Sequence, residues 1–244
     1  MDHTTAWTEQ NTRLVELVRP ADPAAPVPTC PEWTIRQLVA HVGRGDRWST
    51  AIVRGGEFVH PRDVPGGKPP EDPDGAADWL AQGPALLAEA VAEAGPDTPV
   101  WTFTGPKPAA WWLRRRLHEA VVHHADAAIA LGAPYVVEPA VAADGISEWL
   151  DLLVAGSAKR TGPPLLAEGQ SLHLHATDEG LGTAGEWLAR PGPEWEHGHG
   201  KGTVAVRGPA ADLLLALMRR RPADSVEVHG DAQVFETWLA GTPF

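Results

Sequence analysis

Glu119 and His123 lie four residues apart in a segment, 109–131, that is apolar over most of its helical circumference. Side chains at this spacing project to nearly the same side of an α-helix, about 5 to 6 Å apart at Cβ. A carboxylate and an imidazole are both ligands that Zn²⁺ accepts, and a glutamate buried without a partner costs several kcal/mol. The spacing therefore predicts two metal ligands, although the same pair would also serve as a hydrogen-bonded pair in a core or on a surface.

A third ligand is needed, because catalytic zinc sites have three protein ligands and one open position. A second predicted helix begins at Thr34, where Gln37 three residues later completes a capping box. His41 falls on the apolar face of this helix beside Leu38 and Val42, so we expect it to face inward. His41, Glu119 and His123 form the predicted ligand set.

Other polar residues crowd the same region. Asp126 follows His123 by three residues and could orient its ring as a hydrogen-bond acceptor, which metal-binding histidines usually need, or be an ordinary surface carboxylate. We assign no role to His118 and His124. Four further histidines are weaker metal candidates, because paired histidines in strands or glycine-rich loops are mostly surface groups: His173 and His175, and His197 and His199.

Cys30 is the only cysteine, which excludes an intramolecular disulfide and a cysteine-rich zinc site. It could be a nucleophile, but its proline-bracketed loop favours a buried structural thiol outside the predicted metal site. We expect the tryptophans to be mainly core residues, with one or two lining a pocket: Trp33, Trp48, Trp111 and Trp112. The arginine runs 114–116 and 219–221 are predicted to be solvated helix ends.

The elements that hold these residues are predicted from apolar periodicity and from glycine and proline breaks. The first part of the chain should form helices over about 5–18, from 34 onward, 76–94, 109–131 and 139–158, with a long loop over 55–74. After a Gly/Pro break at 161–164 the pattern changes to short strands over 171–176, 203–206 and 226–229, with helices over 209–220 and 232–239.

The predicted fold class is therefore α+β, with two domains. Residues 1–160 form a metal-binding helical bundle, and residues 161–244 form a small α+β domain.

Composition limits the classes of function. The net charge of −12 argues against sequence-independent binding to nucleic acid, which depends on Lys and Arg. The longest apolar run, 213–218, is far shorter than the roughly 18 residues that cross a bilayer, and the first residues do not have the pattern of a secretion signal. We therefore expect a soluble cytoplasmic protein with a small-molecule substrate, as a monomer or a small homo-oligomer.

Three segments are distinctive: VPTCPEWTIRQLVAHVGRGDRW, LHEAVVHHADAAIALGAP and GPAADLLLALMRRRPADSVEVHGDAQVFETWL. In sequence and in order they resemble the mycothiol-dependent maleylpyruvate isomerase family, which is related to DinB-like helical bundles. The resemblance implies a metal, usually zinc, bound by His41, Glu119 and His123. The chain departs from the family pattern at Glu32, where a small residue is commoner, at the pair His124-Ala125, and at Arg219, which replaces a glycine.

The resemblance also implies mycothiol as a thiol cosubstrate and a cis-trans isomerisation by reversible thiol addition. Arg220 is our candidate for contact with a substrate carboxylate, since arginine binds carboxylates in a bidentate fork. The alternatives are a mycothiol S-transferase that acts on an electrophilic small molecule, a non-catalytic ligand-binding protein of the same fold, and metal-assisted hydrolysis with Glu119 as base.

Overall fold

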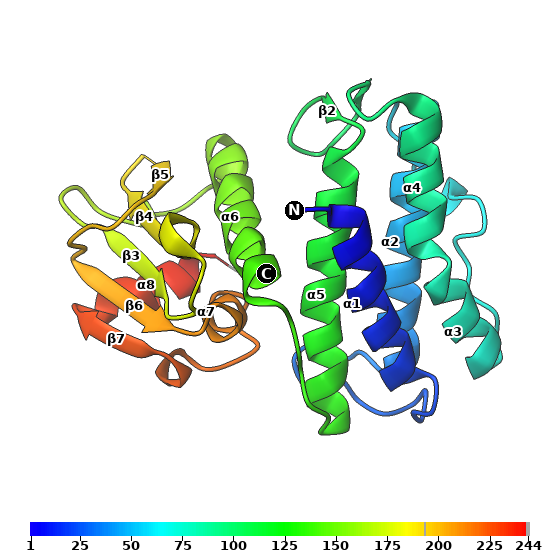
Figure 1. The fold of residues 1–244 in the computed structure, drawn as a ribbon, viewed down its shortest axis with the longest axis horizontal. Helices are drawn as coiled ribbons and strands as arrows, with labels where there is room; N and C mark the ends of the chain where they lie inside the picture. Colours follow the sequence, from blue (N-terminus) through cyan, green and yellow to red (C-terminus); the bar gives the residue numbers. More distant parts are fainter. Residues whose placement is uncertain (193, 243–244) are drawn as a thin grey trace. The chain divides into compact units, whose positions relative to one another are not determined.

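The computed structural model describes residues 1–192 and 194–242. These described residues form two compact units, with the division between Val136 and Val137. The first unit contains α1 (His3–Val18), α2 (Ile35–Gly55), α3 (Pro73–Ala81), α4 (Gly83–Ala94) and α5 (Trp111–Leu131). A short hairpin of β1 (Pro99–Val100) and β2 (Lys107–Pro108) precedes α5. Within this unit α1, α2, α4 and α5 run side by side as a bundle (Figure 1).

Local sequence signals explain where the two site-bearing helices begin and end. The capping box predicted for α2 is present, since the Thr34 N–H donates to Gln37 Oε1 at 2.7 Å. Both α2 and α5 end at a glycine with positive φ, Gly56 at 74° and Gly132 at 62°. The single helix predicted over 76–94 is instead divided into α3 and α4 at Gln82, where Pro84 follows and cannot donate a backbone hydrogen bond.

The second unit contains α6 (Pro139–Gly156), α7 (Ala210–Leu217) and α8 (Ala232–Gly241). Its five-stranded sheet consists of β3 (Leu172–Ala176), β4 (Glu186–Arg190), β5 (Glu194–His197), β6 (Val204–Gly208) and β7 (Glu227–Gly230). The strand order is β5-β4-β3-β6-β7, and only the central pair β3–β6 is parallel. Within this unit Figure 1 shows the helices beside the sheet. The predicted α+β fold, with an N-terminal helical bundle and a small C-terminal α+β domain, is confirmed.

Two details of the second half differ from the sequence prediction. The structure divides the chain at residue 136, earlier than the predicted boundary at 160, because α6 packs with the second unit. Ser147 of α6 accepts a hydrogen bond from the indole N–H of Trp187 on β4 at 2.9 Å, and both side chains are buried. The Gly/Pro break at 161–164 is therefore a loop inside the second unit. Strands β4 and β5 were not predicted.

Candidate metal centre

The predicted ligands His41, Glu119 and His123 come together in the first unit. Glu119 Oε2 lies 3.6 Å from His41 Nε2 and 3.7 Å from His123 Nε2, and the three ligand atoms all lie within 4.8 Å of one another. Bonds of about 2.0 to 2.1 Å in tetrahedral geometry place zinc ligands roughly 3.4 Å apart. The donor set therefore fits one divalent ion after small shifts of these side chains.

Burial differs sharply among the three side chains. His123 is 4% exposed and Glu119 18%, whereas His41 is 45% exposed. The expectation that His41 faces inward is wrong. Leu38 and Val42 occupy the centre of the buried stripe of α2 with no exposed surface, and His41 lies at its rim. The candidate site therefore has a buried side on α5 and an open side on α2.

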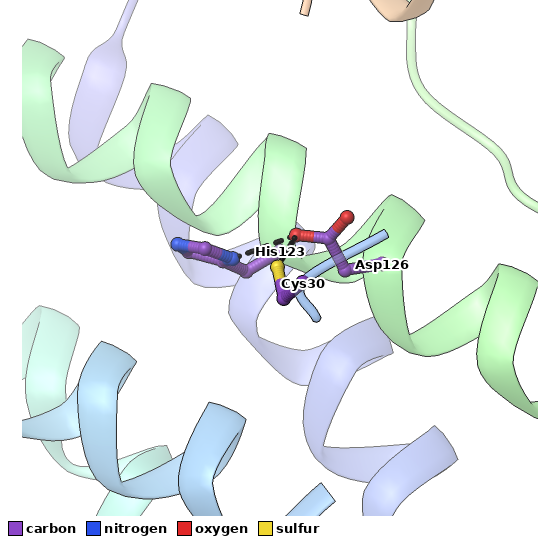
Figure 2. Close-up of side chains that lie close together, drawn as sticks. All are labelled: Cys30, His123 and Asp126. Carbon is purple, nitrogen blue, oxygen red and sulfur yellow. Dashed lines mark hydrogen bonds and ion pairs between the residues drawn. The ribbon is translucent and has the colours of Figure 1, made fainter. Parts of the chain in front are cut away.

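A second group of side chains holds His123 from the opposite edge of its ring. His123 Nδ1 lies 2.9 Å from Asp126 Oδ2, and Asp126 is fully buried (Figure 2). The same carboxylate accepts from Thr29 Oγ1 at 2.6 Å and from Cys30 Sγ at 3.4 Å. Asp126 thus has the geometry of the ring-orienting acceptor, and it fastens the loop before α2 to α5. With Nδ1 protonated toward Asp126, Nε2 is available as a ligand atom.

Cys30 is outside the predicted ligand set, as expected, but it lies next to it, which the sequence did not predict. Its side chain is half-buried, and its thiol, His123 and Asp126 converge (Figure 2). Sequence reasoning missed this because Cys30 and Asp126 are 96 residues apart in the chain. The proline-bracketed loop gave no sign of which helix it would contact.

Two arginines on α5 hold the Glu119 carboxylate. Arg115 Nη2 donates to Glu119 Oε1 at 2.8 Å, and Arg116 Nη1 lies 3.4 Å from Oε2. Burial alone would raise the pKa of Glu119, but Arg115, the imidazoles of His123 and His41, and Arg116 hold it well below its usual value. The prediction that residues 114–116 form a solvated helix end is wrong for Arg115 and Arg116, which are both buried.

The charge of Arg116 is balanced inside the bundle. Its Nε donates to Asp46 Oδ1 at 2.8 Å, and its Nη2 donates to the carbonyl of Val42 at 3.0 Å. Asp46 has no exposed surface. Arg116 therefore links α2 to the carboxylate of a candidate ligand on α5.

An open depression of about 510 Å³ adjoins His41, within the first unit. Its walls include Trp33, Arg44 and Trp48. The Trp33 ring lies 4.8 Å from the ring of His41 and 6.0 Å from that of His123, measured between centroids, so this tryptophan lines the candidate site as well as the depression. Sequence reasoning named Trp33 and Trp48 among possible lining residues, but it did not single out Arg44.

The remaining histidines of α5 belong to the core. His124 is buried, with Nδ1 3.0 Å from Gln10 Oε1 and its ring 5.1 Å from that of Tyr135. Burial and the nearby charge of Arg13 lower the pKa of His124 to about 4, so it is neutral near pH 7. His118 is also buried.

Arg220 lies in the second unit, just after α7, where its Nη1 donates to the carbonyl of Met218 at 2.8 Å. Its contact with a substrate carboxylate stays a prediction. Arg219 and Arg221 are exposed, as expected for a helix end.

The fold and the site together define a class: a protein with an N-terminal helical bundle in which two imidazoles and a carboxylate converge, with His41 at an open depression, followed by an α+β unit. The family profile described as the mycothiol maleylpyruvate isomerase N-terminal domain matches residues 4–128, and the C-terminal domain profile of the same family matches residues 140–237. The chain belongs to the mycothiol maleylpyruvate isomerase family.

Two solved structures share the fold. A crystal structure of the mycothiol-dependent maleylpyruvate isomerase superposes with a TM-score of 0.60 at 19% identity, and a mutant of that enzyme superposes with 0.63 at 15% identity. In both cases the similarity covers 93% of this chain and 91% of the other. A comparison with curated proteins gave no match. Among the described residues, no helix combines the length and apolar character needed to span a membrane.

Proposed function

We propose that this protein is a mycothiol-using isomerase that binds a divalent metal ion, Zn²⁺, through His41, Glu119 and His123, and acts on a small molecule with an activated cis double bond, such as maleylpyruvate. The observation that carries the proposal is the convergence of three donor atoms from two helices beside an open depression. Membership in the family supports the choice of thiol and reaction.

The proposed roles follow from the contacts in the bundle. A divalent ion bound here lowers the pKa of a nearby thiol and so supplies thiolate at neutral pH. His123 is the buried ligand that Asp126 orients, and His41 is the ligand at the open edge. Arg115 and Arg116 hold the Glu119 carboxylate ionised and fixed. The metal-assisted hydrolysis considered above would need Glu119 as a free base, which its two arginine contacts disfavour.

The proposed reaction is an isomerisation in which the thiol is added and then released, so it consumes no further reagent. The thiolate sulfur forms a bond to one carbon of the double bond, and the π electron pair moves to the conjugated carbonyl as an enolate. The former double bond is then a single bond and rotates. Collapse of the enolate breaks the carbon–sulfur bond, so that the trans isomer and the thiolate are released.

The wall of the depression suits a small acidic substrate. Trp33 and Trp48 present apolar surface that excludes water, and Arg44 supplies a guanidinium on the same wall. Arg220 remains a proposed contact for a substrate carboxylate. We further propose that the partners are small molecules and not nucleic acid, given the net charge of −12, and that the chain is a monomer or a small homo-oligomer.

The metal assignment is tested by elemental analysis of His41→Ala, Glu119→Ala and His123→Ala after equilibration with Zn²⁺. Each variant should lose one equivalent relative to the wild type. His60→Ala is the matched control, because His60 is an exposed histidine of the same unit outside the ligand group. Metal content that is unchanged in all three variants would refute the assignment.

The reaction is tested with maleylpyruvate and mycothiol. An isomerase needs the thiol only in catalytic amount and leaves the free thiol concentration unchanged, whereas an S-transferase consumes one thiol per turnover. Thiol consumption would replace the isomerase proposal with the transferase. If a panel of cis-enoyl and other electrophilic substrates reacts no faster with protein, metal and thiol than without the protein, the non-catalytic binding protein takes the place of both.

A further inference from the structure

A second group of possible metal ligands lies in the second unit, on one face of the sheet. His173 and His175 are two residues apart on β3, so their side chains share a face. His175 is directly opposite Glu186 on β4, and His173 is opposite Leu188. The other face of β3 carries Leu172 and Leu174, which are buried in the core of this unit. The histidines and Glu186 therefore meet on the side of β3 opposite these two leucines.

The glycine-rich segment after β5 brings a third histidine to this group. A Cβ at Gly200 would lie 2.7 Å from Leu188 Cδ2, and a Cβ at Gly202 would lie 3.0 Å from the backbone nitrogen of His173. Neither position has room for a larger residue without a shift of its neighbours. The glycines thus allow the segment to pack closely over the sheet, and His199, which directly precedes Gly200, reaches Glu186.

His173 and His199 both contact the same carboxylate oxygen of Glu186. Glu186 Oε2 lies 3.0 Å from His173 Nε2 and 2.7 Å from His199 Nδ1, and the three ligand atoms lie within 4.8 Å of one another. The rings of His173 and His199 are 5.4 Å apart. Ligands of a tetrahedral zinc ion are roughly 3.4 Å apart, so small side-chain shifts would open the space for an ion.

The geometry points to a second divalent-metal site, formed by His173, Glu186 and His199, which takes Zn²⁺ or a similar ion that accepts nitrogen and oxygen ligands. His173 is 5% exposed and Glu186 19%, so two ligands are held by the sheet, while His199 is 77% exposed and closes the site from the loop. His175, with its ring 5.9 Å from that of His173, is the nearest candidate for a fourth ligand.

A metal ion at this site would restrain the segment 198–202 by attaching it more firmly to β3 and β4. Without an ion, the segment bonds to Glu186 through His199 and through the backbone N–H of Gly198, which donates to the Glu186 carbonyl at 3.3 Å. Lys201 in this segment is an exposed trypsin site. Metal binding here does not depend on the proposed enzymatic function, since the ligands are distinct from His41, Glu119 and His123.

The test measures Zn²⁺ bound to the full chain by equilibrium dialysis. The wild type should bind two equivalents, and His199→Ala and Glu186→Gln should each bind one. His123→Ala should also bind one, by losing the other site, and His123→Ala combined with His199→Ala should bind none. His229→Ala is the matched control that should keep both equivalents, because His229 is an exposed histidine of the same unit paired with Glu227.

Limited proteolysis distinguishes Zn²⁺ binding at this site from nonspecific Zn²⁺ binding elsewhere on the chain. Zn²⁺ should slow tryptic cleavage after Lys201 in the wild type by at least about 10-fold and have no effect in His199→Ala. Because His199 is mostly exposed, its removal should leave the circular dichroism of the metal-free chain unchanged. If His199→Ala and Glu186→Gln bind as much Zn²⁺ as the wild type, or if the metal does not protect Lys201, the second site is refuted, whatever the result at His123.

Discussion

Arg116 Nε lies 2.8 Å from Asp46 Oδ1, and both side chains are buried. The Arg116 side chain is 6% exposed and that of Asp46 is not exposed at all. The two residues are 70 positions apart, on α5 and α2. Burial raises the pKa of Asp46, and the charge of Arg116 opposes this shift. The ionised form of the buried carboxylate therefore depends on Arg116. The same guanidinium contacts Glu119, so the pair connects the stability of the bundle to the candidate metal centre.

Arg116→Met should destabilise the protein by about 3 to 5 kcal/mol, because it leaves Asp46 buried without its counter-charge. Urea unfolding measures this loss. Arg54→Met is the control, since Arg54 and Glu93 form an exposed pair at 3.8 Å that should contribute less than about 1 kcal/mol. Equal effects of the two substitutions would show that the buried pair has no special role.

Gly45→Ala should place a methyl group 2.7 Å from Arg116 Nη1 and displace this guanidinium from Glu119. We expect a net destabilisation of about 1 to 3 kcal/mol and weaker metal binding. Gly55→Ala, in the last turn of the same helix, has nothing within 4 Å of the added carbon and should be neutral or stabilising by up to about 1 kcal/mol. Thermal unfolding and Zn²⁺ titration of both variants measure this difference between Gly45→Ala and Gly55→Ala. The two variants would behave alike if α2 could move away from α5 to make room for the added methyl group.

Asp126→Asn should weaken Zn²⁺ binding at the first site by about 10 to 100-fold, because an amide no longer orients the His123 ring as a charged acceptor. Competition with a chelator of known affinity gives the dissociation constant. Thr29→Val removes another hydrogen bond to the same carboxylate without touching the ring, and its effect should be much smaller. A similar loss in both variants would indicate a general disturbance of the loop.

Cys30→Ser should retain turnover when mycothiol is supplied, because a serine hydroxyl can still donate to Asp126 Oδ2. The measurement is the rate with maleylpyruvate at a fixed thiol concentration. If Cys30 were itself the attacking thiol, the serine variant would be inactive even with mycothiol present, and the external-thiol mechanism would have to be abandoned.

Glu32→Gly and Arg219→Gly should each stabilise the protein, by about 1 kcal/mol. These two residues are the non-glycine residues with positive φ in the described part of the chain, at 72° and 58°. They are also two of the positions at which the chain departs from the family pattern. Thermal unfolding measures the gain, and Glu71→Gly, at an exposed residue without positive φ, should give none. A loss of stability at both positions would show that local contacts outweigh the backbone strain.

Much of the fold could be predicted from local signals. The capping box at Thr34, the glycine after α5 and the apolar periodicity located the two helices that carry the site, because these signals act within a few residues. Strands β4 and β5 were missed, since residues 186–197 contain charged residues, glycine and proline, and their pairing partners lie elsewhere in the chain.

By itself the sequence determined the ligand set as a hypothesis, because the spacing of Glu119 and His123 on a helix is a local property. Tertiary structure decided the rest. It buried Arg115 and Arg116, which a local pattern assigns to solvent, because Asp46 and Glu119 neutralise them inside the bundle. It placed Cys30 beside His123, turned His41 to the rim of α2, and gathered His173, Glu186 and His199 around one carboxylate oxygen. Each of these outcomes depends on which distant side chains meet after packing, and the spacing of residues along the chain does not contain that information.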